Sequence, residues 1–173
     1  RRPTIYSNQS TVMHNYESLA PQSRAWVYQA NRPLTDAECI AVEEALSQFT
    51  QEWVAHNVAL KAFGKVYHNR FIVLLVDETQ QHATGCSIDK SVKFLQKLED
   101  QLGVQFFDRL LLAYEKDGQV KTVHRNDLEA ALQQGELQAD TIVFNNLIQT
   151  KQEFENQWRI PFKDSWAGQL VAV

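Results

Sequence analysis

The chain has 173 residues, of which 44% are hydrophobic, 10% aromatic and 22% charged. This size and composition are typical of a globular protein with one domain-sized core, and they exclude the disordered and fibrous classes. The formal net charge of -4 provides no overall positive field for nucleic-acid phosphates. No apolar run approaches the ~20 residues that a membrane span needs. We therefore predict a soluble cytoplasmic protein that binds neither nucleic acid nor membrane.

The cysteine content and the N-terminus bear on the cellular compartment. Cys39 and Cys86 are too few for a disulfide framework and are typical of reduced thiols in the cytoplasm, although a single bridge stays possible. The chain begins with Arg1-Arg2, but the polar residues that follow lack the apolar segment of a twin-arginine export signal. We expect residues 1–15 to form a flexible tail.

The first half of the chain predicts a strand, a helix, two strands and a second helix, over residues 25–30, 35–53, 61–67, 71–77 and 88–102. Thr35 and Glu38 form a capping-box pattern in front of the first helix, whose apolar residues recur at helical spacing. Residues 71–76 are continuously apolar, which favours a strand in the centre of a sheet. Gly103 ends the second helix.

The second half predicts further strands over residues 109–114, 119–123 and 141–144, and a terminal helix from residue 150 to about residue 158. Asp117 and Gly118 are typical of a tight hairpin turn, because glycine tolerates the positive φ that such a turn requires. A short helix begins at Asn126 or Asp127 and runs through Leu132.

The element order through Tyr114 is strand, helix, strand, strand, helix, strand. This order predicts an α+β protein with a ferredoxin-like βαββαβ antiparallel sheet and helices on one face. Its fourth strand would lie at an edge, where the strand at 119–123 could add. We expect the ferredoxin-like core to span residues 16–115. Residues 116–173 would form a small extension of hairpin, helix and strand, packed on the core.

A set of short motifs extends over nearly the whole chain from Tyr16 onward. They are Ala25-Trp26-Val27-Tyr28-Gln29, Asn69-Arg70-Phe71, Val76-Asp77-Glu78, Gly85-Cys86-Ser87-Ile88-Asp89, Phe107-Asp108-Arg109 and Thr141-Ile142-Val143-Phe144-Asn145-Asn146. Together they resemble a bacterial family with no established activity, whose members often carry the label "ABC transporter ATPase". That label implies a glycine-rich phosphate loop ending in Gly-Lys-Ser or Gly-Lys-Thr. The sequence has no such run, so we reject ATP hydrolysis as its chemistry.

A second resemblance concerns the C-terminal part. Its motifs are Asp117-Gly118, Asp127-Leu128-Glu129, Gln134-Gly135-Glu136-Leu137 and Asp140-Thr141-Ile142-Val143-Phe144. The arrangement of turn, helix and strand is similar to that of small bacterial modules related to the GYF domain, which bind peptides. The aromatic Gly-Tyr-Phe-type signature of that domain is absent.

Cys86 is the candidate catalytic residue. It lies at the start of a predicted helix, where free backbone amides and the helix dipole favour a thiolate. Lys90 would assist one turn later, whereas Asp89 would oppose the effect. In the alternative, Cys86 packs as a small apolar residue and Ser87 caps the helix. We expect Cys39, on the apolar face of the first helix, to belong to the core.

Other polar or aromatic residues at strand ends and turns are candidates for binding. They are Asn69, Arg70, Ser87, Asp89, Asp108, Arg109, Asn145, Asn146 and Trp166. The two asparagines at 145 and 146 would either satisfy turn backbone groups or offer donors to a peptide. Asp77 and Glu78 are neighbours on a strand and point to opposite faces, so we favour a loop cap or ion pair over acid–base work. The histidines lack paired ligand spacing, and we expect no metal and no cofactor.

No catalytic constellation emerges from these patterns. We therefore predict a non-enzymatic protein-binding or adaptor domain, whose partner is another protein or a second copy of the chain. An antiparallel sheet with open edge strands favours strand addition or self-association. The alternatives are a thiol-dependent enzyme or redox-responsive protein that uses Cys86, and a small-ligand binder with a site in the sheet cleft.

Overall fold

The computed structural model describes residues 14–171 of the chain, so residues 1–13 of the predicted tail lie outside the described residues. The described part is an α+β protein with four α-helices and antiparallel strand pairs. The strand orders in its sheets are β1-β5-β4, β2-β3 and β7-β6-β8-β9. No helix within residues 14–171 is both long and apolar enough to cross a membrane.

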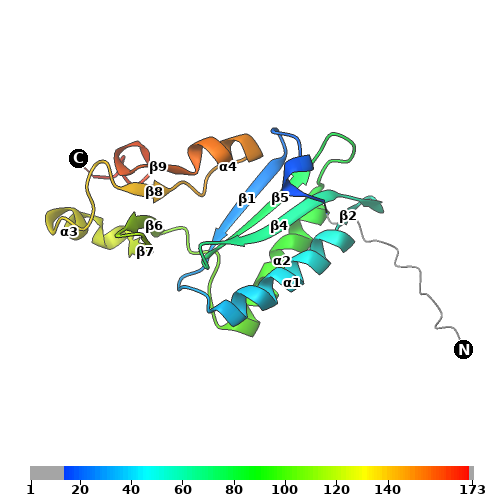
Figure 1. The fold of residues 1–173 in the computed structure, drawn as a ribbon, viewed down its shortest axis with the longest axis horizontal. Coiled ribbons are helices and arrows are strands. Elements are labelled where there is room, and N and C mark those ends of the chain that lie inside the picture. Colours follow the sequence, from blue (N-terminus) through cyan, green and yellow to red (C-terminus); the bar gives the residue numbers. More distant parts are fainter. Residues whose placement is uncertain (1–13, 172–173) are drawn as a thin grey trace, which may run out of the picture.

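The first sheet and its helices comprise β1 (Arg24–Gln29), α1 (Asp36–Glu52), β4 (Lys61–Tyr67), β5 (Phe71–Asp77) and α2 (Gly85–Leu102). α1 and α2 cover one face of this sheet (Figure 1). The capping box of Thr35 and Glu38 is confirmed, since each side chain accepts a hydrogen bond from the other residue's N–H. β5 is buried throughout and lies between β1 and β4, as its apolar run predicted.

The second sheet contains β6 (Leu111–Lys116), β7 (Gln119–His124), β8 (Ile142–Phe144) and β9 (Arg159–Pro161), accompanied by α3 (Leu128–Gln133) and α4 (Lys151–Gln157). The predicted hairpin turn is confirmed, because Asp117 and Gly118 have φ values of 53° and 74° between β6 and β7. A small hairpin of β2 (Val54–Ala55) and β3 (Val58–Ala59) was not predicted. Three single 3-10 turns complete the order: η1 (Tyr16–Ser18), η2 (Arg125–Asp127) and η3 (Phe162–Asp164).

The ferredoxin-like topology is not confirmed, because the strand order and the number of sheets differ. The stretch predicted as the fourth strand forms β6, which pairs with β7 and β8 and not with β1. The hairpin offers β6 a partner across a two-residue turn, and closing so short a loop costs little entropy. β7 therefore adds to β6 in the second sheet and not to the edge of the first. As a result, β1 remains an edge strand.

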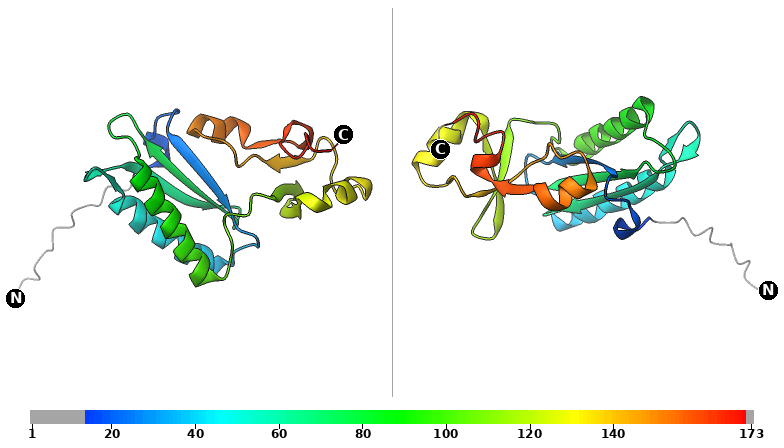
Figure 2. Two further views of the ribbon diagram at one scale, coloured as in Figure 1. Left: turned by 180° about the vertical axis from the view of Figure 1, so that it is seen from behind. Right: turned by 90° about the horizontal axis from the view of Figure 1, so that it is seen from above.

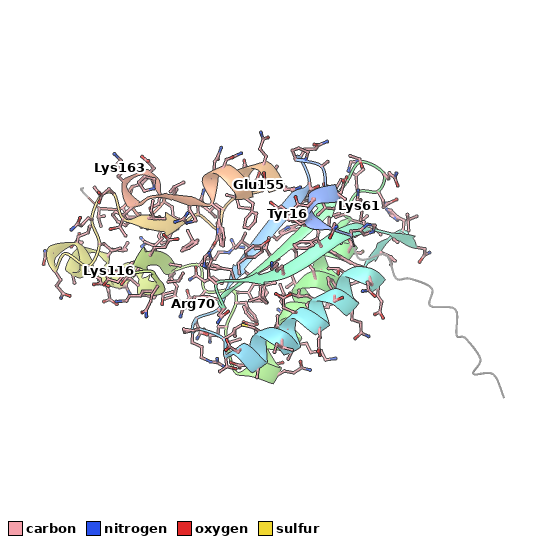
Figure 3. The ribbon with its side chains drawn as sticks, in the orientation of Figure 1. Tyr16, Lys61, Arg70, Lys116, Glu155 and Lys163 are labelled. Carbon is pink, nitrogen blue, oxygen red and sulfur yellow. The ribbon has the colours of Figure 1, made fainter. Side chains whose placement is uncertain are left out.

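The face of the first sheet opposite α1 and α2 carries the C-terminal part of the chain. Apolar side chains of β5 pack there against Phe144, Ile148, Phe154 and Trp158. Figure 2 shows α4 on this side of the sheet, away from the two long helices. Tyr16 also packs on this face and holds α4 there, since its hydroxyl donates a 2.6 Å hydrogen bond to the carboxylate of Glu155 on α4 (Figure 3). The first sheet is thus covered on both faces, but not along β1.

Candidate functional site: a groove along the edge of β1

A groove of about 590 Å³ follows the outer edge of β1, and every residue of that strand lines it. Residues 106–109 line its side nearest the helices and are called the helix-side wall below. Phe144 and residues 146–150 line the other side and are called the C-terminal wall. This volume lies within the range of about 300–1,000 Å³ that ligand sites occupy.

The pairing of β1 with β5 fixes which backbone groups face the groove. Alternate residues of a strand direct their N–H and C=O groups to the same neighbouring strand. The N–H of Ala30 donates to the carbonyl of Arg70 at 2.8 Å, so Ala30 and, by alternation, Tyr28 and Trp26 pair inward with β5. The residues between them direct their backbone groups outward, into the groove.

Val27 and Gln29 supply these outward groups. No hydrogen bond within residues 14–171 engages the N–H or the C=O of Val27, or the N–H of Gln29. Backbone donors and acceptors that are removed from water are almost always paired in folded proteins. A short open length of sheet edge therefore forms the floor of the groove.

One end of this edge already carries an antiparallel rung. Thr150 forms a bridge with Arg24, and the N–H of Ala25 donates to the carbonyl of Gln149 at 3.0 Å. The chain preceding Gln149 then leaves the edge in a turn, where the side-chain oxygen of Asn145 accepts the N–H of Leu147 at 3.2 Å. The edge of β1 thus accepts an antiparallel strand, but among the described residues the chain itself pairs only with the Arg24 end of β1.

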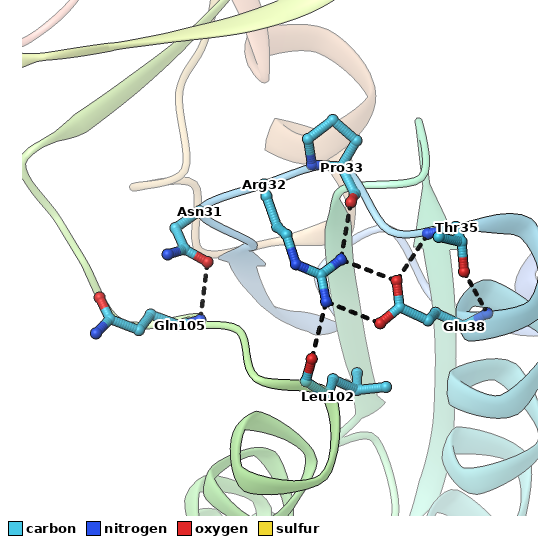
Figure 4. A network of polar contacts seen from close by, with 7 residues as sticks. All are labelled: Asn31, Arg32, Pro33, Thr35, Glu38, Leu102 and Gln105. Atoms are coloured by element: carbon cyan, nitrogen blue, oxygen red, sulfur yellow. Dashed lines mark hydrogen bonds and ion pairs between the residues drawn. The ribbon is translucent and has the colours of Figure 1, made fainter.

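A polar network holds the helix-side wall in place (Figure 4). Arg32 binds Glu38 through two hydrogen bonds of 2.8 and 2.9 Å, and it donates a third, of 2.8 Å, to the carbonyl of Leu102 at the end of α2. The hydrogen bonds from Arg32 hold the pKa of Glu38 at about 2. Asn31 and Gln105 exchange two further hydrogen bonds, of 3.0 and 2.9 Å. The loop after β1 is thereby joined to the segment that leads into the wall.

A second network joins β1 to the C-terminal wall. The side-chain amide of Asn146 donates to the side-chain oxygen of Gln29 at 3.0 Å, and the indole N–H of Trp158 donates to Asn146 at 3.0 Å. Gln29 is only 6% exposed, and its amide nitrogen also reaches the carbonyl of Leu111 at 3.5 Å. These contacts fix the end of the groove near Gln29 relative to both sheets.

Each wall exposes a large apolar side chain. Phe107 of the helix-side wall is 37% exposed and meets Tyr28 edge-on, with ring centroids 5.4 Å apart. Leu147 of the C-terminal wall is 66% exposed. Exposed apolar side chains beside a concave surface are typical of sites that bind other molecules.

The structure brings four of the predicted binding residues to the groove: Asp108, Arg109, Asn146 and Trp166. Asn145 lies beside them and shapes the turn that carries Leu147. Asn69 lies elsewhere, in the turn between β4 and β5, with φ 52° and a 3.4 Å hydrogen bond to Asp36.

Arg70, another predicted binding residue, is buried. It lies at the end of the first sheet that faces the second, and its Nη1 donates to the carbonyl of Val120 on β7 at 3.4 Å (Figure 3). Burial lowers the pKa of this guanidinium, and its Nε has no hydrogen-bond partner within residues 14–171. Arg70 therefore joins the two sheets and offers no exposed surface to a ligand.

Cys86 is exposed on the first turn of α2, so the alternative in which it packs as a small apolar residue is wrong. Thr84, and not Ser87, is the N-cap of α2, because Ser87 occupies the third helical position of the capping box and is buried. The cavity beside Cys86 measures about 370 Å³ and is also lined by His56 and Lys90. Asp89 points to a different contact, an ion pair with Lys93 at 3.0 Å.

The carboxylates of Asp77 and Glu78, at the end of β5, accept hydrogen bonds from different parts of the chain. Asp77 accepts hydrogen bonds from the N–H of Ala20 and from Thr79, whereas Glu78 accepts the N–H of Ala83. Within residues 14–171, no three His, Cys, Asp or Glu side chains are grouped as they would be around a metal ion. The groove is therefore the site with the clearest geometry in the described part of the chain.

Sequence reasoning missed the central feature of this site. The floor of the groove is backbone of Val27 and Gln29, and no residue type signals that its backbone will stay unpaired. Leu147 offered a weak signal, because it is an apolar residue directly after two asparagines in a turn. Comparisons with family models, curated proteins and solved structures found no match at a significant level. The functional assignment therefore follows from the geometry of the groove itself.

Proposed function

We propose that the chain is a non-enzymatic protein-binding module that takes up an extended segment of a partner protein by strand addition at β1. The observation that carries the proposal is the open edge of Val27 and Gln29 on the floor of a walled groove. In this binding mode, main-chain hydrogen bonds supply affinity and pockets for alternate side chains supply specificity.

The bound segment would take the place that the fourth strand has in a ferredoxin-like sheet. That place is next to β1, on the side away from β5. The rung between Arg24 and Thr150 supports antiparallel pairing at this edge. On this proposal, the ferredoxin-like order is completed by the partner and not by the chain itself.

The walls favour a single segment over a second copy of the whole protein. Neighbouring strands lie about 4.8 Å apart in a sheet. Two copies that paired β1 with β1 would have to bring the exposed side chains of Phe107 and Leu147 from both molecules into that narrow space. A lone extended strand carries no such walls.

Val27→Pro tests the proposal directly. Proline removes the outward N–H and places its ring where the carbonyl of an added strand would lie. Because that N–H has no partner within the described residues, pairing with β5 keeps its hydrogen bonds, and proline is accepted on edge strands for this reason. Val27→Ala removes side-chain methyls but keeps the N–H, so it is the matched control.

The probe is a displayed library of random peptides selected on the wild-type protein. Selected peptides are expected to bind Val27→Ala only slightly more weakly than wild type, because the lost cross-strand contact of the Val27 methyls is small. They should bind Val27→Pro at least about tenfold more weakly, because a backbone hydrogen bond and the space for the strand are both lost. Urea unfolding checks that both variants are folded.

Hydrogen exchange in the wild-type protein gives an independent measurement that needs no variant. Peptide binding should slow exchange of the amides of Val27 and Gln29, which an added strand would engage. Peptides that bind Val27→Pro as well as wild type, and leave both amides unprotected, would show that strand addition at β1 does not occur.

A further inference from the structure

The charged residues that line the groove are two arginines, Arg24 and Arg109, and one carboxylate, Asp108, whereas the chain as a whole has a formal net charge of -4. Arg109 of the helix-side wall is exposed and has no ion pair with any carboxylate within residues 14–171. Asp108 is the one carboxylate among the described residues that lines the groove, and its Oδ1 accepts the N–H of Leu110 at 3.0 Å. The guanidinium of Arg109 can therefore form an ion pair with a bound molecule.

A second cation stands at the other end of β1. Arg24 lies over the ring of Trp26, with 4.7 Å from its guanidinium carbon to the ring centroid. Its side chain is 42% exposed, and its only carboxylate contact among the described residues is a long one, 3.7 Å, to Glu78. The groove thus has an arginine near each end of its floor.

The pairing geometry determines which residues of a bound segment meet these arginines. Residues directly opposite each other in an antiparallel pair point to the same face. Trp26 and Tyr28 pack on the helix side, so the segment residues opposite them point there as well. Arg109 lies on this side as well, because it belongs to the same wall as Phe107, whose ring meets that of Tyr28 at 5.4 Å.

The segment residue opposite Val27 points the other way. Val27 packs with the apolar cluster of the C-terminal part, so this residue would face the C-terminal wall, where Ile148 is buried and Leu147 is exposed. An apolar side chain fits this environment. The two faces of the bound strand therefore meet different chemistry.

We propose that the partner segment alternates acidic and apolar residues, with an apolar side chain opposite Val27 and an acidic one opposite Tyr28, beside Arg109. This inference rests on the proposed function, since it uses the register that strand addition imposes. A nucleic acid could also pair its phosphates with arginine, but it has no backbone N–H and C=O ladder to match the open edge of β1.

The test compares selections of random displayed peptides on the wild-type protein, on Arg109→Gln and on Val27→Pro. Peptides from the wild-type selection are expected to carry Asp or Glu next to an apolar residue. Where a peptide has two acidic residues, they should be two positions apart. A synthetic selected peptide should bind wild type roughly two- to fivefold more tightly than its Glu→Gln analogue, as an exposed ion pair allows. Added salt should reduce this difference.

Arg109→Gln should abolish the preference for the acidic peptide, so that this variant binds the acidic peptide and its neutral analogue with equal affinity. Peptides without an acidic preference, or a preference that persists in Arg109→Gln, would overturn the charge assignment and leave strand addition standing. Displacement of the peptide by single-stranded DNA would overturn it too. If no peptide is selected, or if selected peptides bind Val27→Pro equally well, both proposals fail.

Discussion

Asp77 allows the electrostatics of the first sheet to be tested in detail, because its carboxylate is charged although its side chain is only 3% exposed. Burial by itself would raise its pKa. Hydrogen bonds from the N–H of Ala20 at 2.9 Å and from the hydroxyl and N–H of Thr79 at 2.7 and 3.0 Å, together with Lys61 at 3.7 Å, instead lower that pKa to about 2. Replacing Asp77 by asparagine (Asp77→Asn) keeps the shape of the side chain and removes its charge.

The magnitude follows from the two pKa values. The ordinary pKa of this group is 3.8 and the folded value is about 2. At about 1.36 kcal/mol for each pKa unit, the difference corresponds to roughly 2 kcal/mol of stability. Because the folded pKa lies below the unfolded one, this contribution is fully present above about pH 5 and is lost progressively as the pH falls through 3.8 to 2. Asparagine cannot titrate, so its variant lacks this dependence.

The assay is urea unfolding of wild type and Asp77→Asn at several pH values between 7 and 2. The difference between their unfolding free energies should be at least about 2 kcal/mol at pH 7 and should shrink by roughly that amount as the pH falls to 2. Asp100→Asn, at an exposed site on α2, is the control and should change stability by less than about 0.5 kcal/mol. A wild-type to Asp77→Asn difference that stays constant over this pH range would show that the hydrogen bonds and Lys61 do not lower the pKa of Asp77.

Two further predictions concern α1 and α2. Cys86 is exposed and should react with a thiol reagent in the native protein, whereas Cys39 is half-buried, its pKa is raised by burial, and it should react more slowly. Equal rates, followed by mass spectrometry, would contradict this difference, and reaction of Cys86 faster than a free thiol would support the thiol-dependent alternative. Gly103→Ala should lower stability by about 1 kcal/mol, because Gly103 ends α2 with φ 65°. Gly85→Ala, at the other end of the same helix, should not lower it, since an added Cβ meets open space there. A thermal melt of Gly103→Ala that matches wild type would contradict the left-handed helix end.

The local elements of this protein could be predicted from the residue pattern alone. The start of α1 was predictable because Thr35 and Glu38 exchange hydrogen bonds only three residues apart. The hairpin turn at Gly118 and the end of α2 at Gly103 were predictable for a similar reason, since a positive φ is a property of single residues. The central position of β5 followed from its apolar run, because only a strand covered on both faces can be apolar throughout.

Which strands pair, and therefore where the site lies, depends on how the whole chain folds. The pattern of β6 predicted a strand but could not name its partner, because hydrophobic alternation specifies faces and not neighbours. The hairpin with β7 took β6 into the second sheet and left the edge of β1 open. The groove then depends on contacts between distant residues, such as Gln29 and Asn146, which are 117 positions apart. Such contacts form only when the whole chain has folded, so no local pattern could have shown that the backbone of Val27 would remain unpaired.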